Sequence, residues 1–232
     1  MTRAMILAAG RGERMGALTT ERPKPLLSIG HETLIERHVR LLVAAGVERI
    51  VVNLSYRGQQ IRALLGDGAR YDARIDYSSE GEPPLETGGG IIHALRLLGN
   101  DPFVVVNADV VSDYSLSRLV GSGLSDGRLG RLVLVPNPVH HPQGDFGIDA
   151  DANATLEEPL LTFSGISLLD PALFRGHARG RQPLKPILDT AIRARRMAAE
   201  VHHGLWVDVG TAERLGEATG RVTSAQSASE TR

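Results

Sequence analysis

The stretch from Leu7 to Leu27 reads LAAGRGERMGALTTERPKPLL and begins at the end of a short apolar run that starts at Ala4. An apolar run of this kind predicts a buried strand that ends where the loop begins. Gly10 and Gly12 allow the backbone to turn sharply and to approach a ligand closely. Because exposed N–H groups in such a loop bind phosphate oxygens, the stretch predicts a phosphate-binding loop after the first strand.

Charged residues in this loop strengthen that prediction. Arg11 and Arg14 bring positive charge, and the planar guanidinium of Arg14 can pair with two phosphate oxygens. Lys24 lies between Pro23 and Pro25, which restrict the backbone where the ammonium group must point. The dinucleotide fingerprint G-x-G-x-x-G and the P-loop are both incomplete here. A glycine-rich turn with solvated arginines is the alternative, and the fixed Pro-Lys-Pro argues against it.

The pattern L-A-A-G-x-G-x-R-M followed by P-K-P-L resembles the signature of the sugar-1-phosphate nucleotidylyltransferases. These enzymes join a nucleoside triphosphate to a sugar 1-phosphate and release pyrophosphate. The resemblance implies that Arg14 neutralises the leaving pyrophosphate and that Lys24 acts on the phosphates at the reacting centre, both as catalytic residues. It implies a nucleotide-binding set in this loop: Ala9, Gly10, Arg11, Gly12, Glu13, Arg14 and Lys24.

Composition narrows the possible function classes. The chain has 232 residues, 42% of them hydrophobic, which suits one α/β domain with a sizeable core. A net charge of -1 predicts no general affinity for nucleic acid. The absence of cysteine excludes disulfides and thiolate metal sites and fits a reducing cytosol. No apolar run reaches the roughly 18 residues of a spanning helix, so a cytoplasmic protein without a membrane partner is expected.

Apolar runs alternate with helical periodicities along the chain. Strands are expected at 4–7, 50–54, 75–77, 103–106, 132–135 and 161–169, and the T-x-x-E box from Thr33 to Glu36 predicts a helix start. This order predicts parallel strands with helices on both faces of the sheet. The family resemblance implies a doubly wound, Rossmann-like nucleotidyltransferase fold with a mixed central sheet. A single domain is expected over residues 1–218, with a base-binding first half and a sugar-binding second half, and residues 219–232 are expected to form a flexible tail.

A glycine-rich segment, EGEPPLETGGG, spans residues 80–90 and precedes a predicted helix. Such a helix start leaves its first amides free for anions or base carbonyls, although a flexible loop capped by glycines is the common alternative. By the resemblance, Gly81 meets the nucleobase through its backbone, with Thr87 and Gly88 close by. The doubled proline at 83–84 is one residue longer than the family pattern, which leaves the register open.

Two aspartates follow predicted strands in separate motifs. Asp109 follows the apolar strand at 103–106, and ligands of open parallel sheets bind beyond the carboxyl ends of the strands. An aspartate that caps the next turn is the alternative. Asp208 lies in W-x-D-x-G-T. By the resemblance, Asp109 and Asp208 are catalytic and hold Mg²⁺, which prefers carboxylates, phosphates and water, while Asn107 faces the sugar. Residue 108 is alanine where the family has glycine.

The segment N-P-x-H-H-P-x-G-D-F at 137–146 resembles one branch of the family, the N-acetylmuramate 1-phosphate uridylyltransferases. By that resemblance Asp145 contacts the sugar, the substrates are UTP and N-acetylmuramate 1-phosphate, and cell-wall recycling is the implied pathway. His140 and His141 are expected to lie in a solvated loop, since adjacent side chains diverge. Enzymes that form UDP-glucose or GDP-mannose, and a non-catalytic nucleotide-sugar sensor, are the alternatives. The sequence leaves the oligomeric state open, a monomer included.

Overall fold

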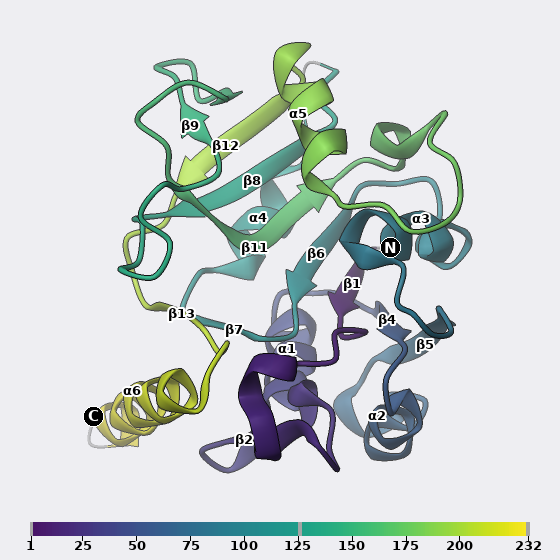
Figure 1. Cartoon of the computed structure of the whole chain (residues 1–232), viewed down its shortest axis with the longest axis vertical. Coiled ribbons are helices and arrows are strands. Elements are labelled where there is room, and N and C mark those ends of the chain that lie inside the picture. The colour runs from purple at the N-terminus through teal and green to yellow at the C-terminus, as the bar shows by residue number, and fades with distance from the viewer. Residues whose placement is uncertain (1, 125–126, 231–232) are drawn as a thin grey trace.

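A seven-stranded mixed sheet crosses the protein in the order β12-β8-β11-β6-β1-β4-β5 (Figure 1). The structure is a computed structural model, and it describes residues 2–124 and 127–230. Strand β11 runs antiparallel to β6 and β8, while β1 is parallel to its neighbours β4 and β6. The strands of this sheet are β1 (Arg3–Leu7), β4 (Arg49–Leu54), β5 (Arg74–Ser79), β6 (Phe103–Asn107), β8 (Gly130–Val135), β11 (Thr162–Leu169) and β12 (Met197–Val201).

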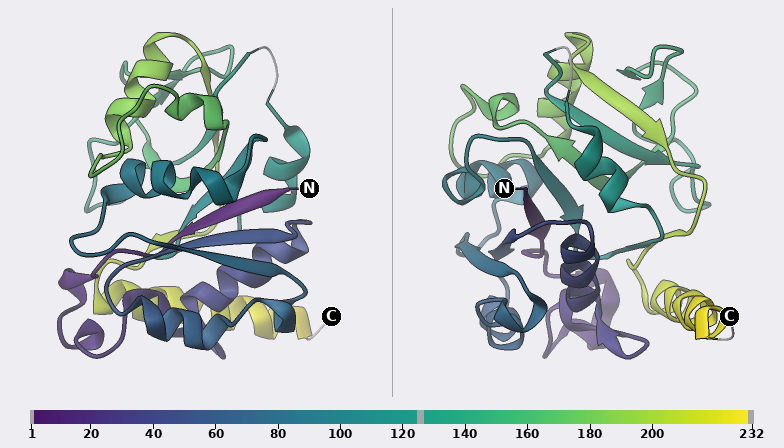
Figure 2. Two further views of the ribbon diagram at one scale, coloured as in Figure 1. Left: turned by 90° about the vertical axis from the view of Figure 1, so that its right-hand side faces the viewer. Right: turned by 180° about the vertical axis from the view of Figure 1, so that it is seen from behind.

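Helices cover both faces of the sheet, as Figure 2 shows. Helices α1 (Leu34–Ala44), α2 (Gly58–Leu65) and α4 (Leu116–Ser122) enclose one core, and α3 (Glu86–Leu98) and α5 (Lys185–Arg193) enclose the other. Because side chains alternate along a strand, β1 directs Ala4 and Ile6 into the first core and Met5 into the second. The doubly wound α/β fold with a mixed sheet is therefore confirmed.

Helix α1 begins at the predicted capping box. The Glu36 carboxylate accepts from the Thr33 N–H at 3.0 Å, and the Thr33 hydroxyl accepts from the Glu36 N–H at 3.3 Å. His38 lies on the buried face of this helix, and burial lowers its pKa to about 4. It is therefore a neutral core residue at neutral pH.

A second, two-stranded sheet pairs β7 (Val110–Ser112) with β13 (Trp206–Asp208) in antiparallel order. Helix α6 (Ala212–Glu230) follows β13 and packs Ala218 and Val222 into a third apolar cluster. The expected boundary at residue 218 falls inside α6. Val222 is 2% exposed, so an apolar contact holds the helix beyond that point. The last two residues of the expected tail lie outside the described residues.

The remaining elements are short and lie in the connections. Among the described residues, no helix is long and apolar enough to cross a membrane. The short elements are β2 (Ser28–Ile29), β3 (Glu32–Thr33), β9 (Gly147–Ile148), β10 (Ala154–Thr155), and the 3₁₀ helices η1 (Glu13–Thr19), η2 (Lys24–Leu26), η3 (Ala69–Tyr71) and η4 (Pro171–Phe174).

Candidate active site

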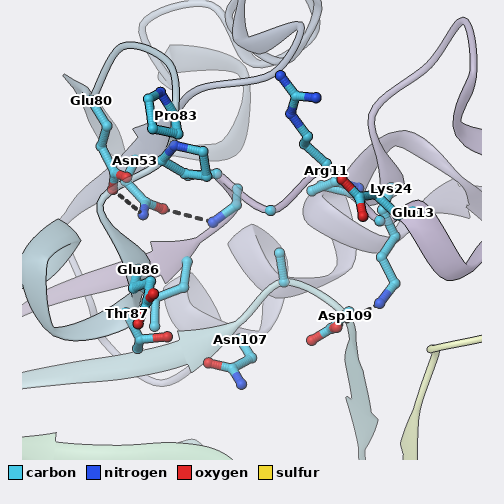
Figure 3. Close-up of a pocket in the computed structure, with 18 of the residues that line it drawn as sticks. Arg11, Glu13, Lys24, Asn53, Glu80, Pro83, Glu86, Thr87, Asn107 and Asp109 are labelled. Carbon is cyan, nitrogen blue, oxygen red and sulfur yellow. Dashed lines mark hydrogen bonds and ion pairs between the residues drawn. The ribbon is translucent and has the colours of Figure 1, made fainter. Parts of the chain in front are cut away.

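A cavity of about 780 Å³, here called the main cavity, opens at the carboxyl ends of β1, β4, β5 and β6 (Figure 3). Parallel strands bring their carboxyl ends to the same edge of a sheet, which is why loops far apart in sequence meet there. Asn107, which was predicted to face the sugar, lines it together with most of the residues predicted to bind nucleotide or metal: Ala9, Gly10, Arg11, Gly12, Glu13, Arg14, Lys24, Thr87 and Asp109.

The loop after β1 is held by a buried polar chain. The Ala8 N–H donates to Asn53 Oδ1 at 2.7 Å, and Asn53 Nδ2 donates to Glu80 Oε1 at 2.6 Å (Figure 3). Glu80 Oε2 in turn accepts from the Leu85 N–H at 2.8 Å, just before α3. Asn53 is 3% exposed, so these bonds satisfy a polar group that burial would otherwise make costly. The sequence analysis did not predict these hydrogen bonds, although a single Asn within the apolar run of β4 indicated a buried polar contact.

Within the loop, Gly12 has φ 67° and precedes the 3₁₀ helix η1. A Cβ atom at this position would lie 3.0 Å from the Lys24 Cβ, so glycine permits the loop to pack on Lys24. Arg11 pairs with Glu82 at 2.7 Å, which links the loop to the segment before α3. Over the described ranges, Arg14 is exposed and has no ion-pair partner, so its guanidinium is available to a phosphate.

The two predicted metal-binding aspartates lie next to each other in the fold. Asp208 stands opposite Val110 in the β7–β13 pair, and the Val209 N–H donates to the Asp109 backbone carbonyl at 2.7 Å. Lys24 Nζ lies 2.6 Å from Asp109 Oδ2, and the two side chains point toward one another in Figure 3. Two segments about one hundred positions apart in the printed sequence thus meet beside the phosphate loop.

Asp208 pairs with Arg214 of α6 and with His140, whose Nε2 lies 2.9 Å from Asp208 Oδ1. Within the part of the chain that the structure describes, no three His, Cys, Asp or Glu side chains form a metal-binding cluster. Two carboxylates nevertheless suit Mg²⁺, which often takes one or two carboxylates and completes its shell with water and substrate phosphates. The donor set therefore fits this ion.

The glycine-rich start of α3 differs from its prediction. Helix α3 begins at Glu86, so the three glycines lie inside the helix and are buried. The Gly89 N–H donates to the Gln182 carbonyl at 2.9 Å, and a Cβ atom at Gly89 would overlap the Gly180 carbonyl oxygen. Gly88 and Gly89 thus accommodate the segment 180–183, here called the strap, whereas a Cβ atom at Gly90 would meet Glu80 Oε1. The Gly89 amide is therefore not free for an anion.

Two predicted base-binding residues do not line the main cavity. Gly81 is exposed, and its carbonyl accepts from the Ser55 hydroxyl at 2.6 Å. Gly88 is buried under the strap, where a Cβ atom would lie 2.9 Å from the Gln182 carbonyl oxygen. Their contact with a nucleobase remains a prediction. Arg181 of the strap does line the cavity and pairs with Glu86 at 2.8 Å, which the sequence analysis missed.

A second cavity of about 370 Å³ adjoins the first, and both are lined by Glu86, Thr87 and Asn107. Asp145 lines this second cavity, so the two residues predicted to contact the sugar lie together. Asp145 Oδ2 also accepts from the Phe163 N–H at 2.8 Å, which fixes the carboxylate against β11.

The two adjacent histidines are not simply solvated. His140 contacts Asp208, and His141 Nε2 lies 3.2 Å from Asp145 Oδ1. The side chains diverge, as expected, but each meets one of the predicted site carboxylates. Both histidines are partly exposed, so their side chains remain accessible to solvent.

Comparisons with known proteins agree with this geometry. Residues 3–158, more than half of the chain, match the nucleotidyl transferase family. The chain belongs to the nucleotidyl transferase family. A nucleotidyl transferase named N-acetylmuramate alpha-1-phosphate uridylyltransferase, from Neisseria meningitidis, is 45% identical, and the match covers 93% of this chain and 96% of the relative. A protein of the same name from Caulobacter vibrioides is 31% identical, and the match covers 96% of this chain and 97% of the relative.

A solved structure shares the nucleotidyl transferase fold. It comes from Bacillus anthracis, is assigned as a glucose-1-phosphate thymidylyltransferase and contains sucrose. The TM-score is 0.83 at 20% identity, over 95% of this chain and 94% of that one. The resemblance to sugar-1-phosphate nucleotidylyltransferases, drawn from the loop after β1, is thereby confirmed, as is the enzyme class.

Proposed function

We propose that the protein transfers a uridylyl group from UTP to N-acetylmuramate 1-phosphate, giving UDP-N-acetylmuramate and pyrophosphate. The observation that carries this proposal is the junction of two cavities at Glu86, Thr87 and Asn107. The main cavity contains the phosphate loop and suits the nucleotide, while the second contains Asp145 and suits the sugar. The two uridylyltransferase relatives, each matched over nearly its whole length, support the choice of base and sugar.

The proposed reaction needs positioning and charge neutralisation more than acid–base chemistry. An oxygen of the sugar phosphate attacks the α-phosphorus of UTP in line, and the bond from that phosphorus to the oxygen bridging to the β-phosphorus breaks. Because the attacking oxygen is already anionic, no general base is required. Lys24 supplies positive charge beside the reacting phosphorus, and Arg14 pairs with the departing pyrophosphate.

Asp109 and Asp208 would hold Mg²⁺, which when bound supplies further positive charge to the triphosphate. In the β7–β13 pairing Asp208 stands opposite Val110, the residue after Asp109, so the two aspartates come from neighbouring backbone segments. Lys24 and Arg214 balance these carboxylates with positive charge. We also propose that the enzyme acts in the cytoplasm, where it would return a cell-wall amino sugar to its nucleotide-bound form.

The test is a matrix of nucleoside triphosphates and sugar 1-phosphates, with pyrophosphate release as the readout. UTP with N-acetylmuramate 1-phosphate is expected to give the highest kcat/KM. Higher values with glucose 1-phosphate, or with GTP and mannose 1-phosphate, would replace this proposal with another nucleotidylyltransferase. Binding of nucleotide sugars without pyrophosphate release from any pair would indicate a sensor.

A further inference from the structure

The second cavity offers carbon surface as well as polar groups. Its wall is mostly apolar, with the rings of Phe146 and Phe163 and the side chains of Pro183, Leu184 and Leu188. Sugar hydroxyls need hydrogen-bonding partners, whereas such a wall favours a ligand group that carries carbon surface. The cavity therefore has room for an apolar substituent beside the polar sugar.

Lys185 is the basic residue that lines this cavity. Its Nζ atom lies 5.0 Å from the Phe146 ring centroid and donates to Asp189 Oδ1 at 2.8 Å. The chain has only two lysines among its 26 basic residues, Lys24 and Lys185. One lines the main cavity and the other lines the second, while the remaining cationic positions, solvated ones included, are arginine.

Helix stability does not explain a lysine at this position. Lys185 is the first residue of α5, where a positive charge opposes the helix dipole. Its pair with Asp189 places the cation N-terminal to the anion, which is the less favourable order for an i,i+4 pair. Helix stability thus gives no reason for a lysine here, whereas its ammonium group lies over the Phe146 ring in the wall of the second cavity.

We propose that Lys185 and the apolar wall form a subsite for a carboxylate-bearing ether substituent of the sugar, the lactyl group of N-acetylmuramate. This inference rests on the proposed function. The methyl group would contact the wall, and the carboxylate would accept a hydrogen bond from the ammonium group.

The other charged residues of this cavity cannot bind the lactyl carboxylate. Asp145 and Glu86 are acceptors when ionised and repel a carboxylate, and Glu86 already pairs with Arg181. An ammonium group has three donors. The two Asp189 oxygens, at 2.8 and 3.1 Å from Lys185 Nζ, leave one of these donors for a ligand.

The kinetic test uses Lys185→Met, which keeps the aliphatic stem and removes the charge. We compare kcat/KM for N-acetylmuramate 1-phosphate with that for N-acetylglucosamine 1-phosphate. The preference for the muramate is expected to fall roughly 10- to 100-fold, as for the loss of a charged hydrogen bond. The matched control is Arg193→Met, which removes an exposed cation from the other end of α5 and should leave the preference unchanged.

The outcomes separate the subsite from the reaction itself. A wild-type enzyme that does not use the muramate overturns the proposed function and the subsite with it. A wild-type enzyme that prefers the muramate, with a Lys185→Met variant that keeps the same preference, overturns the subsite alone.

A binding experiment gives a readout that does not depend on turnover. With [ε-¹⁵N]lysine incorporated, the wild-type chain should give only two side-chain signals, which Lys185→Met assigns. N-acetylmuramate 1-phosphate should shift the Lys185 signal, N-acetylglucosamine 1-phosphate should leave it in place, and both should shift the Lys24 signal through their phosphate. A Lys185 signal that does not shift with the muramate, or that shifts equally with both sugars, would contradict the proposed subsite.

Discussion

Lys24 Nζ lies 2.6 Å from Asp109 Oδ2, and this pair joins the loop after β1 to the end of β6 inside the main cavity. Lys24 is 7% exposed, so its ammonium group depends on this carboxylate in place of water. Removing either partner leaves the other charge without compensation. Variants at these two positions must therefore be measured for stability as well as for activity.

Asp109→Ala and Asp208→Ala should each lower Mg²⁺-dependent turnover by at least ~100-fold, since both carboxylates are proposed to hold the metal. Asp109→Ala should also lower the free energy of unfolding by about 1–3 kcal/mol, because it leaves buried Lys24 unpaired. Pyrophosphate release over a Mg²⁺ titration and urea unfolding measure the two effects. Near-normal Mg²⁺-dependent turnover in either variant would exclude the two-carboxylate site.

Lys24→Ala should slow the chemical step more than it weakens UTP binding, because its charge is proposed to act mainly in the transition state. Single-turnover rates at saturating UTP and the UTP dissociation constant give the two quantities. Arg22→Ala, which removes a nearby exposed cation, is the control and should change neither. An unchanged rate with weakened affinity would show that Lys24 only holds the substrate.

Arg14→Lys should lower kcat/KM for UTP roughly tenfold or more, although the charge is kept. The planar guanidinium can donate two parallel hydrogen bonds to a phosphate, whereas an ammonium group acts as a point charge. Steady-state kinetics for Arg14→Lys and Arg14→Ala test this. If the lysine variant matches the wild type, charge alone accounts for the role of Arg14.

Asp145→Ala should lower kcat/KM for N-acetylmuramate 1-phosphate and for N-acetylglucosamine 1-phosphate alike. The expected loss corresponds to about 1–3 kcal/mol, as for a hydrogen bond to a charged group. Because Asp145 also accepts from the Phe163 N–H, Asp145→Asn is the better-matched variant, since it keeps one acceptor oxygen. Values of kcat/KM for both sugar 1-phosphates, measured for the wild type and the two variants, test this prediction. A loss confined to the muramate would place Asp145 beside the lactyl group instead.

Gly89→Ala should destabilise the protein by about 1–3 kcal/mol, since the new methyl group would collide with the strap carbonyl of Gly180. Gly216→Ala provides a matched control in helix α6, where no atom lies within 4 Å of the added Cβ, and it should be neutral or stabilising. Thermal unfolding of both variants checks the prediction. Equal stability of the two would show that the strap does not need this close approach.

Local features of the site could be predicted from the sequence. The capping box at Thr33, the turn after β1 that Gly12 allows and the strand-end position of Asp109 each depend on residues close together in the chain. Gly88 and Gly89 of α3 could not be assigned correctly, because the strap that they accommodate is contributed by residues 180–183. Local sequence shows that a glycine is needed there, but not which distant segment requires it.

The interaction partners of buried or paired side chains could not be predicted from the sequence either. Asn53 and Glu80 are joined only after β4 and β5 have paired, and His140 reaches Asp208 through a contact between remote loops. The sequence shows a lysine at position 185, but it does not show that this residue lines the second cavity. Sequence periodicity shows which side chains are buried and gives no information about which tertiary partner each one meets.

The pairing of β7 with β13 has a consequence for biosynthesis. The ribosome adds the loop after β1, Lys24 and Asp109 long before it adds Asp208, so a nascent chain has the first aspartate without the second. Chains that stop before Trp206 would retain the central sheet strands but lack β13. The proposed two-carboxylate site is therefore complete only after β13 has emerged, so the proposed catalysis would depend on one of the last strands to be translated.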